Sequence, residues 1–233
     1  MADIFKDFIQ VTRFAGKNTF GKINKIYMVF IFVFLDFALK STSIFGLIGN
    51  GALTGILTYL LEVFVLCFIA QSLRSLVVYG NSGKKSIANS PANFFQPLLS
   101  TAFYLYLLTI LVSMLTMGAN LRGVIIVNTI VKVLSAALLE EVYINNKMGF
   151  DALKSSFKFV VDNPLTYGLY ALIFVLLETY VTYKFAFAVS LGASKFLIML
   201  LLSLIHSLAC VFKGHLFKYI DENPYRQRKF MRG

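Results

Sequence analysis

The stretch that decides the fold is residues 138–165, which read LLEEVYINNKMGFDALKSSFKFVVDNPL. An apolar run closes at Glu140 and Glu141, a polar segment follows, and a second apolar run begins after Pro164. Within the polar segment, apolar side chains recur at helical spacing among lysines and serines, which is typical of a helix lying along a membrane surface. We therefore predict a unit of membrane helix, amphipathic elbow helix and membrane helix.

The composition places this unit in a membrane. Of 233 residues, 58% are hydrophobic and only 14% are charged, whereas soluble domains carry about a quarter charged residues. Six apolar runs approach the roughly 20 residues that cross the hydrocarbon core, where helices satisfy their own backbone. The runs are residues 26–45, 52–78, 96–117, 121–143, 165–183 and 187–212. We predict an all-α polytopic membrane protein with six transmembrane helices and short amphipathic elbow helices on the cytoplasmic face.

The chain then divides into an N-terminal amphipathic segment, a six-helix membrane domain and a basic cytoplasmic tail. Their predicted bounds are residues 1–25, 26–212 and 213–233. Pro97 and Pro164 each stand where a span begins, a position that suits proline. The two halves around these prolines share one layout, which is either an internal repeat or the ordinary likeness of two helix hairpins.

The net charge of +11 is explained by membrane topology. Lysine and arginine gather in the N-terminal segment, beside residues 84 and 154, and after residue 212. The opposite loops hold only Lys40, Arg122 and Lys184. The positive-inside tendency puts both termini in the cytoplasm of a protein in the cell membrane. Basic residues beside spans also contact anionic lipid, so we expect membrane lipids as partners and no nucleic acid.

One pattern in the elbow resembles a known group of proteins. It comprises Glu141, the segment 149–156 (GFDALKSS), and Asn163-Pro164. This is similar to a recurring arrangement in bacterial six-helix membrane proteins related to the membrane domain of some glycerophosphodiester phosphodiesterases. The resemblance covers about 40 residues by our reading and implies a membrane fold. The phosphodiesterase catalytic domain is absent from these residues, so its activity is not implied.

Ionisable residues within the spans are the candidates for function, because a charge in hydrocarbon is costly. The candidates for an intramembrane polar site are Glu62, Lys132, Glu140, His206, Asp36 and Glu178. Glu62 and Lys132 each lie about ten residues from the outer end of a span, so we predict that they pair at the bundle centre. Asp36 and Lys40 are four residues apart and should pair locally.

Two spans carry polar stripes on one helix face. The stripes are Asn128, Lys132, Ala136 and Glu140 in the fourth span, and Ser203, His206, Ser207 and Cys210 in the sixth. Each stripe lines a substrate path or forms a hydrogen-bonded seam between helices. Cys67 and Cys210 have no metal or redox spacing, and we expect both to be buried apolar residues.

No catalytic motif is legible, so we expect no enzyme and no cofactor. His206 and His215 lack the spacing of a helical zinc pair, and no Ser/His/Asp set or phosphate loop is present. The leading hypothesis is a non-enzymatic accessory or structural subunit that binds lipid, a membrane partner or another copy of itself. The alternative is a small transporter or ligand-capture subunit with a polar intramembrane pocket, and a third is an intramembrane enzyme acting on lipid.

Overall fold

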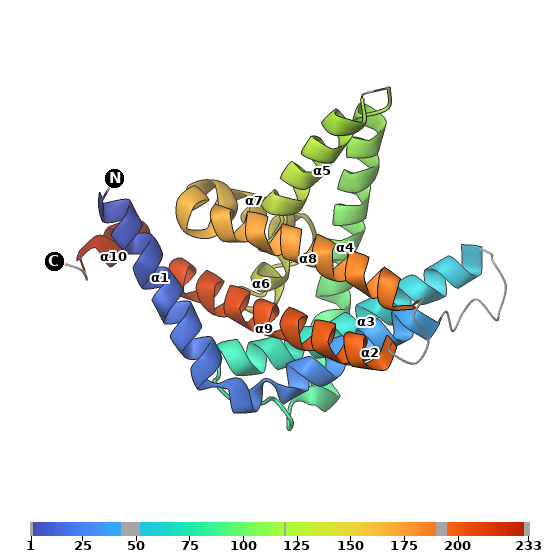
Figure 1. Cartoon of the computed structure of the whole chain (residues 1–233), viewed down its shortest axis with the longest axis horizontal. Coiled ribbons are helices and arrows are strands. Elements are labelled where there is room, and N and C mark those ends of the chain that lie inside the picture. Colours follow the sequence, from blue (N-terminus) through green and yellow to red (C-terminus); the bar gives the residue numbers. More distant parts are fainter. Residues whose placement is uncertain (1, 43–51, 119, 190–194, 231–233) are drawn as a thin grey trace.

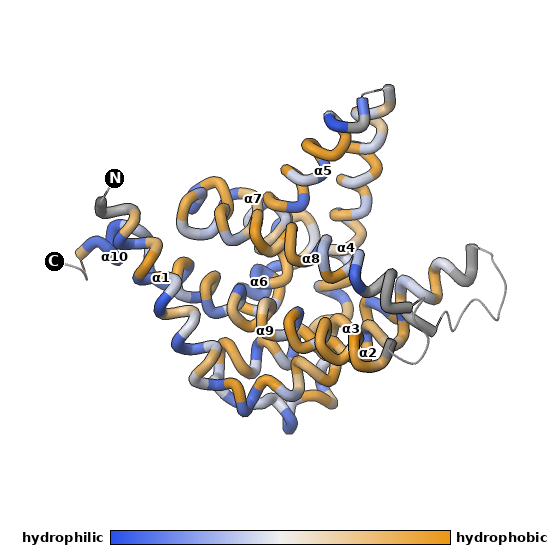
Figure 2. Tube along the Cα trace, viewed as in Figure 1, coloured by the Kyte–Doolittle hydropathy of each residue, from blue (hydrophilic) through white to orange (hydrophobic). Residues whose placement is uncertain are grey.

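The computed structural model describes residues 2–42, 52–118, 120–189 and 195–230, and every regular element in them is a helix. Figure 1 shows α2, α3, α8 and α9 lying together, α1 and α10 at the end that holds both termini, and the α4–α5 hairpin projecting from the rest. Hydrophobic residues cover most of α3, α8 and α9, and hydrophilic residues gather in α10 and in the turns (Figure 2). The all-α prediction is confirmed for the described chain.

Five stretches are long and apolar enough to cross a membrane, which indicates a multi-pass membrane protein. They are Gly55–Val77, Ile87–Leu115, Arg122–Tyr143, Pro164–Lys184 and Phe196–Glu222. The predicted first span corresponds to α2, Tyr27–Thr42. Its 16 described residues are fewer than the roughly 20 that cross the hydrocarbon core. The end of that predicted span, residues 43–45, lies outside the described residues.

The N-terminal segment forms α1, Ala2–Gly21, which packs along α9, Lys195–Glu222. Its apolar face buries Val11 and Ala15, and the ring of Phe14 stacks on that of Tyr219 with centroids 4.1 Å apart. The predicted N-terminal amphipathic segment is thus helical over most of its length. A short turn of 3-10 helix, Ile23–Lys25, then leads into α2.

The third span departs from the prediction at Pro97. Helix α4 runs from Ser90 to Leu115 without a break, with a proline in its first turn and Pro97 inside the helix. The residues from Ser90 to Pro97 therefore belong to the same helix as the predicted span. Pro91 takes the terminal position that was assigned to Pro97, where the missing N–H has no helical acceptor to lose. The predicted likeness between the two halves fails at this point.

The second half contains a separate helix between its two apolar stretches. Helix α7, Gly149–Asp162, is followed by a π-helical turn, Pro164–Gly168, and then by α8, Leu169–Val189. The turn that precedes α7 needs Gly149, because its φ of 59° is a left-handed conformation that favours glycine. The Gly149 N–H donates to Thr101 Oγ1 at 2.8 Å, which ties the start of α7 to α4.

The fourth span is discontinuous. Helix α5, Leu121–Leu134, ends in a turn at residues 135–137, and α6, Leu138–Tyr143, resumes the helix. Two carbonyls at the break accept hydrogen bonds from other elements. Ser156 Oγ donates to Leu134 O at 2.8 Å, and Lys213 Nζ donates to Ala136 O at 3.0 Å. The broken backbone is thus satisfied by α7 and α9, as a break within a membrane requires.

The C-terminal region is folded onto the bundle. Helix α9 continues past residue 212 to Glu222, so the predicted domain boundary falls inside a helix, and α10, Tyr225–Phe230, follows. Arg228 of α10 is buried and donates from Nε and Nη2 to the Asp7 carboxylate of α1 at 3.0 and 2.9 Å. Residues predicted as a tail therefore connect the two ends of the chain.

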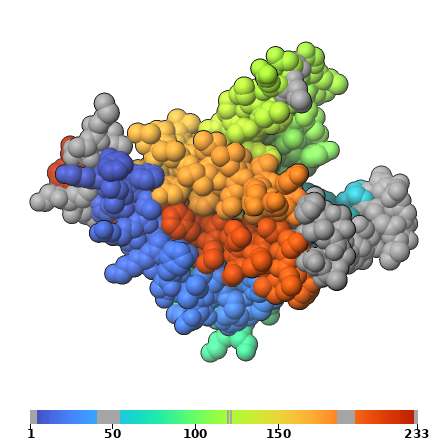
Figure 3. Space-filling model, in the orientation of Figure 1, coloured from blue at the N-terminus to red at the C-terminus, as the bar shows by residue number. Residues whose placement is uncertain are grey.

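The core of the bundle lies between α2, Ala52–Val77 (α3) and α9, with α4 and α6 on one side. A second apolar cluster joins α1, α7, α8 and the last turns of α9. The α4–α5 hairpin contributes little to either cluster towards its tip, where large apolar side chains are exposed. Figure 3 shows the tip of this hairpin projecting beyond α8 in the space-filling view.

Candidate intramembrane site

A cavity lies where the α4–α5 hairpin meets α8 and α9. Its volume is about 430 Å³, within the roughly 300–1,000 Å³ of ligand pockets. Most of its walls are aliphatic, from Leu66 on α3, Leu98 and Leu105 on α4, and Leu138 and Leu139 on α6. An elongated apolar group fits such walls, because it removes hydrocarbon surface from water without leaving polar partners unpaired.

Three charged side chains reach this cavity from three helices. Lys132 comes from α5, Glu178 from α8 and Lys213 from α9. Lys132 and Glu178 are exposed, and among the described residues neither forms an ion pair within 4 Å. Exposed charges in spanning helices are costly against hydrocarbon, and they normally face a polar or water-filled space. The cavity therefore combines apolar walls with charges of both signs.

The break in the fourth span opens onto the same cavity. Ser135 and Ala136, two residues of the turn between α5 and α6, are part of its wall. Ser135 Oγ donates to Val131 O at 2.9 Å, so its hydroxyl is directed back into α5. Irregular backbone within a membrane is tolerated where it is buried in protein or lines a cavity, and broken helices commonly mark binding sites in transporters.

Lys213 connects the cavity to a buried carboxylate. Its Nζ lies 3.4 Å from Glu140 Oε2, and Glu140 is fully buried. Neither Glu140 oxygen accepts a hydrogen bond from the described residues, and the same is true of the buried hydroxyls of Tyr143 and Tyr167. Glu140 thus depends on the Lys213 ammonium for charge compensation, since a buried unpaired charge is strongly destabilising.

A smaller hollow of about 50 Å³ adjoins the cavity. The two share Phe174, Glu178 and Lys213, and the hollow adds His206 and Cys210 from α9. Helical spacing puts His206 and Cys210 one turn apart on the same face of α9. Cys67 is fully buried in α3, as the sequence predicts, whereas Cys210 is only partly buried and lines this hollow.

The structure thus brings together four of the six predicted site residues. Lys132 and Glu178 line the cavity, His206 and Glu178 line the hollow, and Glu140 lies beneath them against Lys213. Asp36 lies apart and pairs with Lys40 at 2.7 Å, which confirms that prediction. Glu62 is absent from both linings.

The direct Glu62–Lys132 ion pair is not formed among the described residues. The reason is the packing of the fourth span, since α5 packs on α7, α8 and α4. Equal depth in the membrane places two residues at one height but does not make their helices neighbours. Lys132 consequently faces the cavity instead of α3.

Sequence reasoning missed Lys213, which the predicted boundary had placed in the tail. The signal was present, because residues 203, 206, 207 and 210 form a polar stripe that residue 213 continues at helical spacing. It also missed the Asp7–Arg228 pair, which joins residues more than 200 positions apart and leaves no local pattern.

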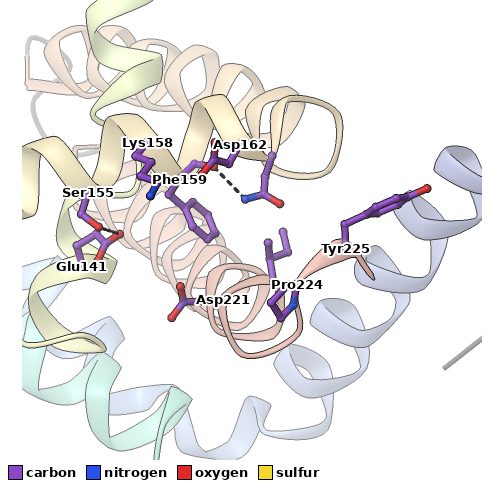
Figure 4. Close-up of a pocket in the computed structure, with 10 residues that line it drawn as sticks. Glu141, Ser155, Lys158, Phe159, Asp162, Asp221, Pro224 and Tyr225 are labelled. Atoms are coloured by element: carbon purple, nitrogen blue, oxygen red, sulfur yellow. Dashed lines mark hydrogen bonds between the residues drawn. The ribbon is translucent and has the colours of Figure 1, made fainter. Parts of the chain in front are cut away.

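A second pocket lies between α7 and the end of α9 (Figure 4). Its volume is about 330 Å³, and carboxylates of Glu141, Asp162 and Asp221 line it. Glu141 is already occupied, as it accepts from Ser155 Oγ at 2.7 Å and lies 3.0 Å from Lys147 Nζ. These contacts make Glu141 an anchor for the start of α7 and for the loop that precedes it.

No group of three or more His, Cys, Asp or Glu residues in the described chain is placed to hold a metal ion. No family model matches the sequence, and comparisons with curated proteins and with solved structures find no match. The resemblance of residues 141–164 to the six-helix group therefore stays a prediction.

Proposed function

We propose that this protein is a non-enzymatic accessory protein of the cell membrane that holds a lipid or another amphipathic molecule in the cavity between α4, α5, α8 and α9. The observation that carries the proposal is the presence of exposed Lys132 and Glu178 in an otherwise mostly aliphatic cavity. Hydrocarbon alone would leave both charges without compensation. A molecule with an apolar chain and a polar head would cover the aliphatic walls and compensate the charges.

The membrane arrangement proposed here has six spans, with α2 as the first and both termini in the cytoplasm. The asymmetry of lysine and arginine supports this orientation. In it, α7 lies along the cytoplasmic face, where exposed Lys154 and Lys158 meet lipid headgroups and buried Leu153 and Val160 meet the bundle. The cavity then lies among the cytoplasmic halves of the spans, because its lining comes from the first half of α4, the end of the fourth span and the last turns of α9.

A small transporter or ligand-capture subunit is the second candidate, and the break between α5 and α6 favours it. Transporters place discontinuous helices at their binding sites, where the ends of half-helices meet substrate. Here the break lies on the cavity wall, and one of its carbonyls is held by Lys213. Both candidates share one binding site and differ in whether the ligand crosses the membrane.

Native mass spectrometry of the full chain released from mild detergent tests the shared site. We expect the unmodified protein to retain an amphipathic adduct. The double variant Lys132→Met/Glu178→Gln should lose at least about tenfold in occupancy, equivalent to about 1.4 kcal/mol. Asp36→Asn/Lys40→Met is the matched control, because it removes a charge pair away from the cavity. An adduct retained equally by all three proteins, or by none, would refute the proposed site.

A further inference from the structure

Four reactive or charged side chains converge on the small hollow beside the cavity. Cys210, His206 and Lys213 come from consecutive turns of α9, and Glu178 faces them from α8. The imidazole of His206 is close enough to interact with the Cys210 thiol and with the charge of Glu178. A thiol, a base and a carboxylate that line one hollow are the parts of an activated cysteine nucleophile.

An aromatic ring of another helix also contacts the imidazole of His206. Phe37 of α2 meets His206 edge-on, with ring centroids 6.0 Å apart. The Lys213 ammonium lies one turn beyond Cys210 and lines the same hollow. Neighbouring cations favour the thiolate form, which is the nucleophile. Cys67 has no such surroundings, because its thiol donates to Val63 O at 3.1 Å within the core.

We propose that Cys210 is an acylation site that takes a fatty acyl group from a long-chain acyl thioester. The Cys210 sulfur attacks the thioester carbonyl, and a new carbon–sulfur bond forms as the bond to the donor thiol breaks. His206 accepts the Cys210 proton and returns it to the departing donor thiolate. No oxidant or reductant is needed, because one thioester replaces another.

The adjoining cavity supplies the place for the acyl chain. Phe174 and Glu178 belong to both linings, so a chain lying along the aliphatic walls reaches the thiol at the shared boundary. The inference rests on the proposed function in one respect, since both require the cavity to admit a hydrocarbon chain. The inference differs from the proposed function in its product, because it predicts a covalent acyl group on the Cys210 sulfur.

The test is acylation of the full chain in phosphatidylcholine nanodiscs by palmitoyl-coenzyme A, followed by intact mass measurement. We expect one acyl group on the unmodified protein and on Cys67→Ser, removable by hydroxylamine, and none on Cys210→Ser. His206→Ala should slow the reaction about a hundredfold at neutral pH. The deficit should shrink above about pH 8.5, where a free thiol ionises without a base.

Three results would overturn the inference. The first is an unmodified protein that takes no acyl group, and the second is acylation that persists in Cys210→Ser. The third is a His206→Ala rate that equals the unmodified rate at every pH. Native mass spectrometry of Cys210→Ser distinguishes a failure of this inference from a failure of the proposed function. Non-covalent lipid binding does not need the thiol, so this variant should still retain the lipid adduct if the proposed function holds.

Discussion

Lys213 compensates the buried charge of Glu140 beside the cavity. Its ammonium donates to Ala136 O at 3.0 Å and lies 3.4 Å from the fully buried Glu140 carboxylate. Lys213→Met should destabilise the protein by about 3–5 kcal/mol, because it leaves a buried charge unpaired. Adding Glu140→Gln should recover much of that loss. Unfolding in detergent measures both changes.

The control for this pair is Lys40→Met, which breaks an ion pair that is partly exposed. Pairs of that kind contribute about 0–1 kcal/mol. A loss at Lys213 no larger than the loss at Lys40 would mean that the Glu140–Lys213 pair does not hold the lower part of the bundle together.

Gly214 is required by the close approach of α9 to α6. A Cβ at this position would overlap the Tyr143 hydroxyl and lie 2.9 Å from Val77 Cγ2. Gly214→Ala should cost about 1–3 kcal/mol in unfolding measurements, as overpacking does. Tyr143→Phe should be nearly neutral alone, because the hydroxyl has no partner in the described chain, and it should reduce the cost of Gly214→Ala.

Gly55→Ala is the matched control, since no heavy atom lies within 4 Å of a Cβ built there. Alanine is favoured over glycine inside a helix, so this change should be neutral or stabilising. If both glycine variants behaved alike, the tight contact at Gly214 would be disproved.

At the scale of the elements, α7 is held to the bundle by side chains of several helices. Ser156 binds the end of α5, Ser155 binds Glu141 of α6, and the first N–H binds Thr101 of α4. Spin labels at Lys154 and Leu153 should therefore differ sharply in their accessibility to a water-soluble relaxation agent, because Lys154 is exposed and Leu153 is buried. Equal accessibility at both positions would indicate a mobile loop instead of a packed helix.

The positions of most helices could be predicted from the sequence, because long apolar runs within a membrane form helices. The break at residues 135–137 could not. Its Ser-Ala-Ala sequence contains no glycine or proline, and alanine is the best helix former. The break is stabilised by Ser156 and Lys213, which are distant in sequence. Pro97 shows the opposite error. The preference of proline for the first turn of a helix predicted that the span begins at Pro97, whereas α4 begins at Ser90 with Pro91 in its first turn.

The candidate site was foreseen in part for the same reason. Lys132, Glu178, His206 and Glu140 could be identified because they are ionisable residues inside apolar runs, where a charge is costly. Their neighbours depended on which helices touch, and neither depth nor spacing determines that. The predicted partner of Lys132 was Glu62, whereas the packing of α5 on α8 directs Lys132 to a cavity shared with Glu178.

On the scale of the whole molecule, α9 connects the cavity to the paired ends of the chain, because Lys213 lines the cavity and Tyr219, further along the same helix, stacks on Phe14 of α1. The buried Asp7–Arg228 pair fastens α10 to α1, and α1 packs along α9. The tip of the α4–α5 hairpin, in contrast, projects beyond the remaining helices (Figures 1 and 3). The buried Asp7–Arg228 pair thus closes the end with the termini, and the cavity lies where the base of the projecting hairpin meets the bundle.

The most direct test of the central claim is an experimental structure of the full chain in lipid nanodiscs. We expect density for an amphipathic molecule in the cavity, with its polar head near Lys132 and Glu178 and its chain along Leu98, Leu105 and Leu139. A hairpin packed against α8 with no cavity between them, or Lys132 and Glu178 joined directly in a dry interface, would contradict the account.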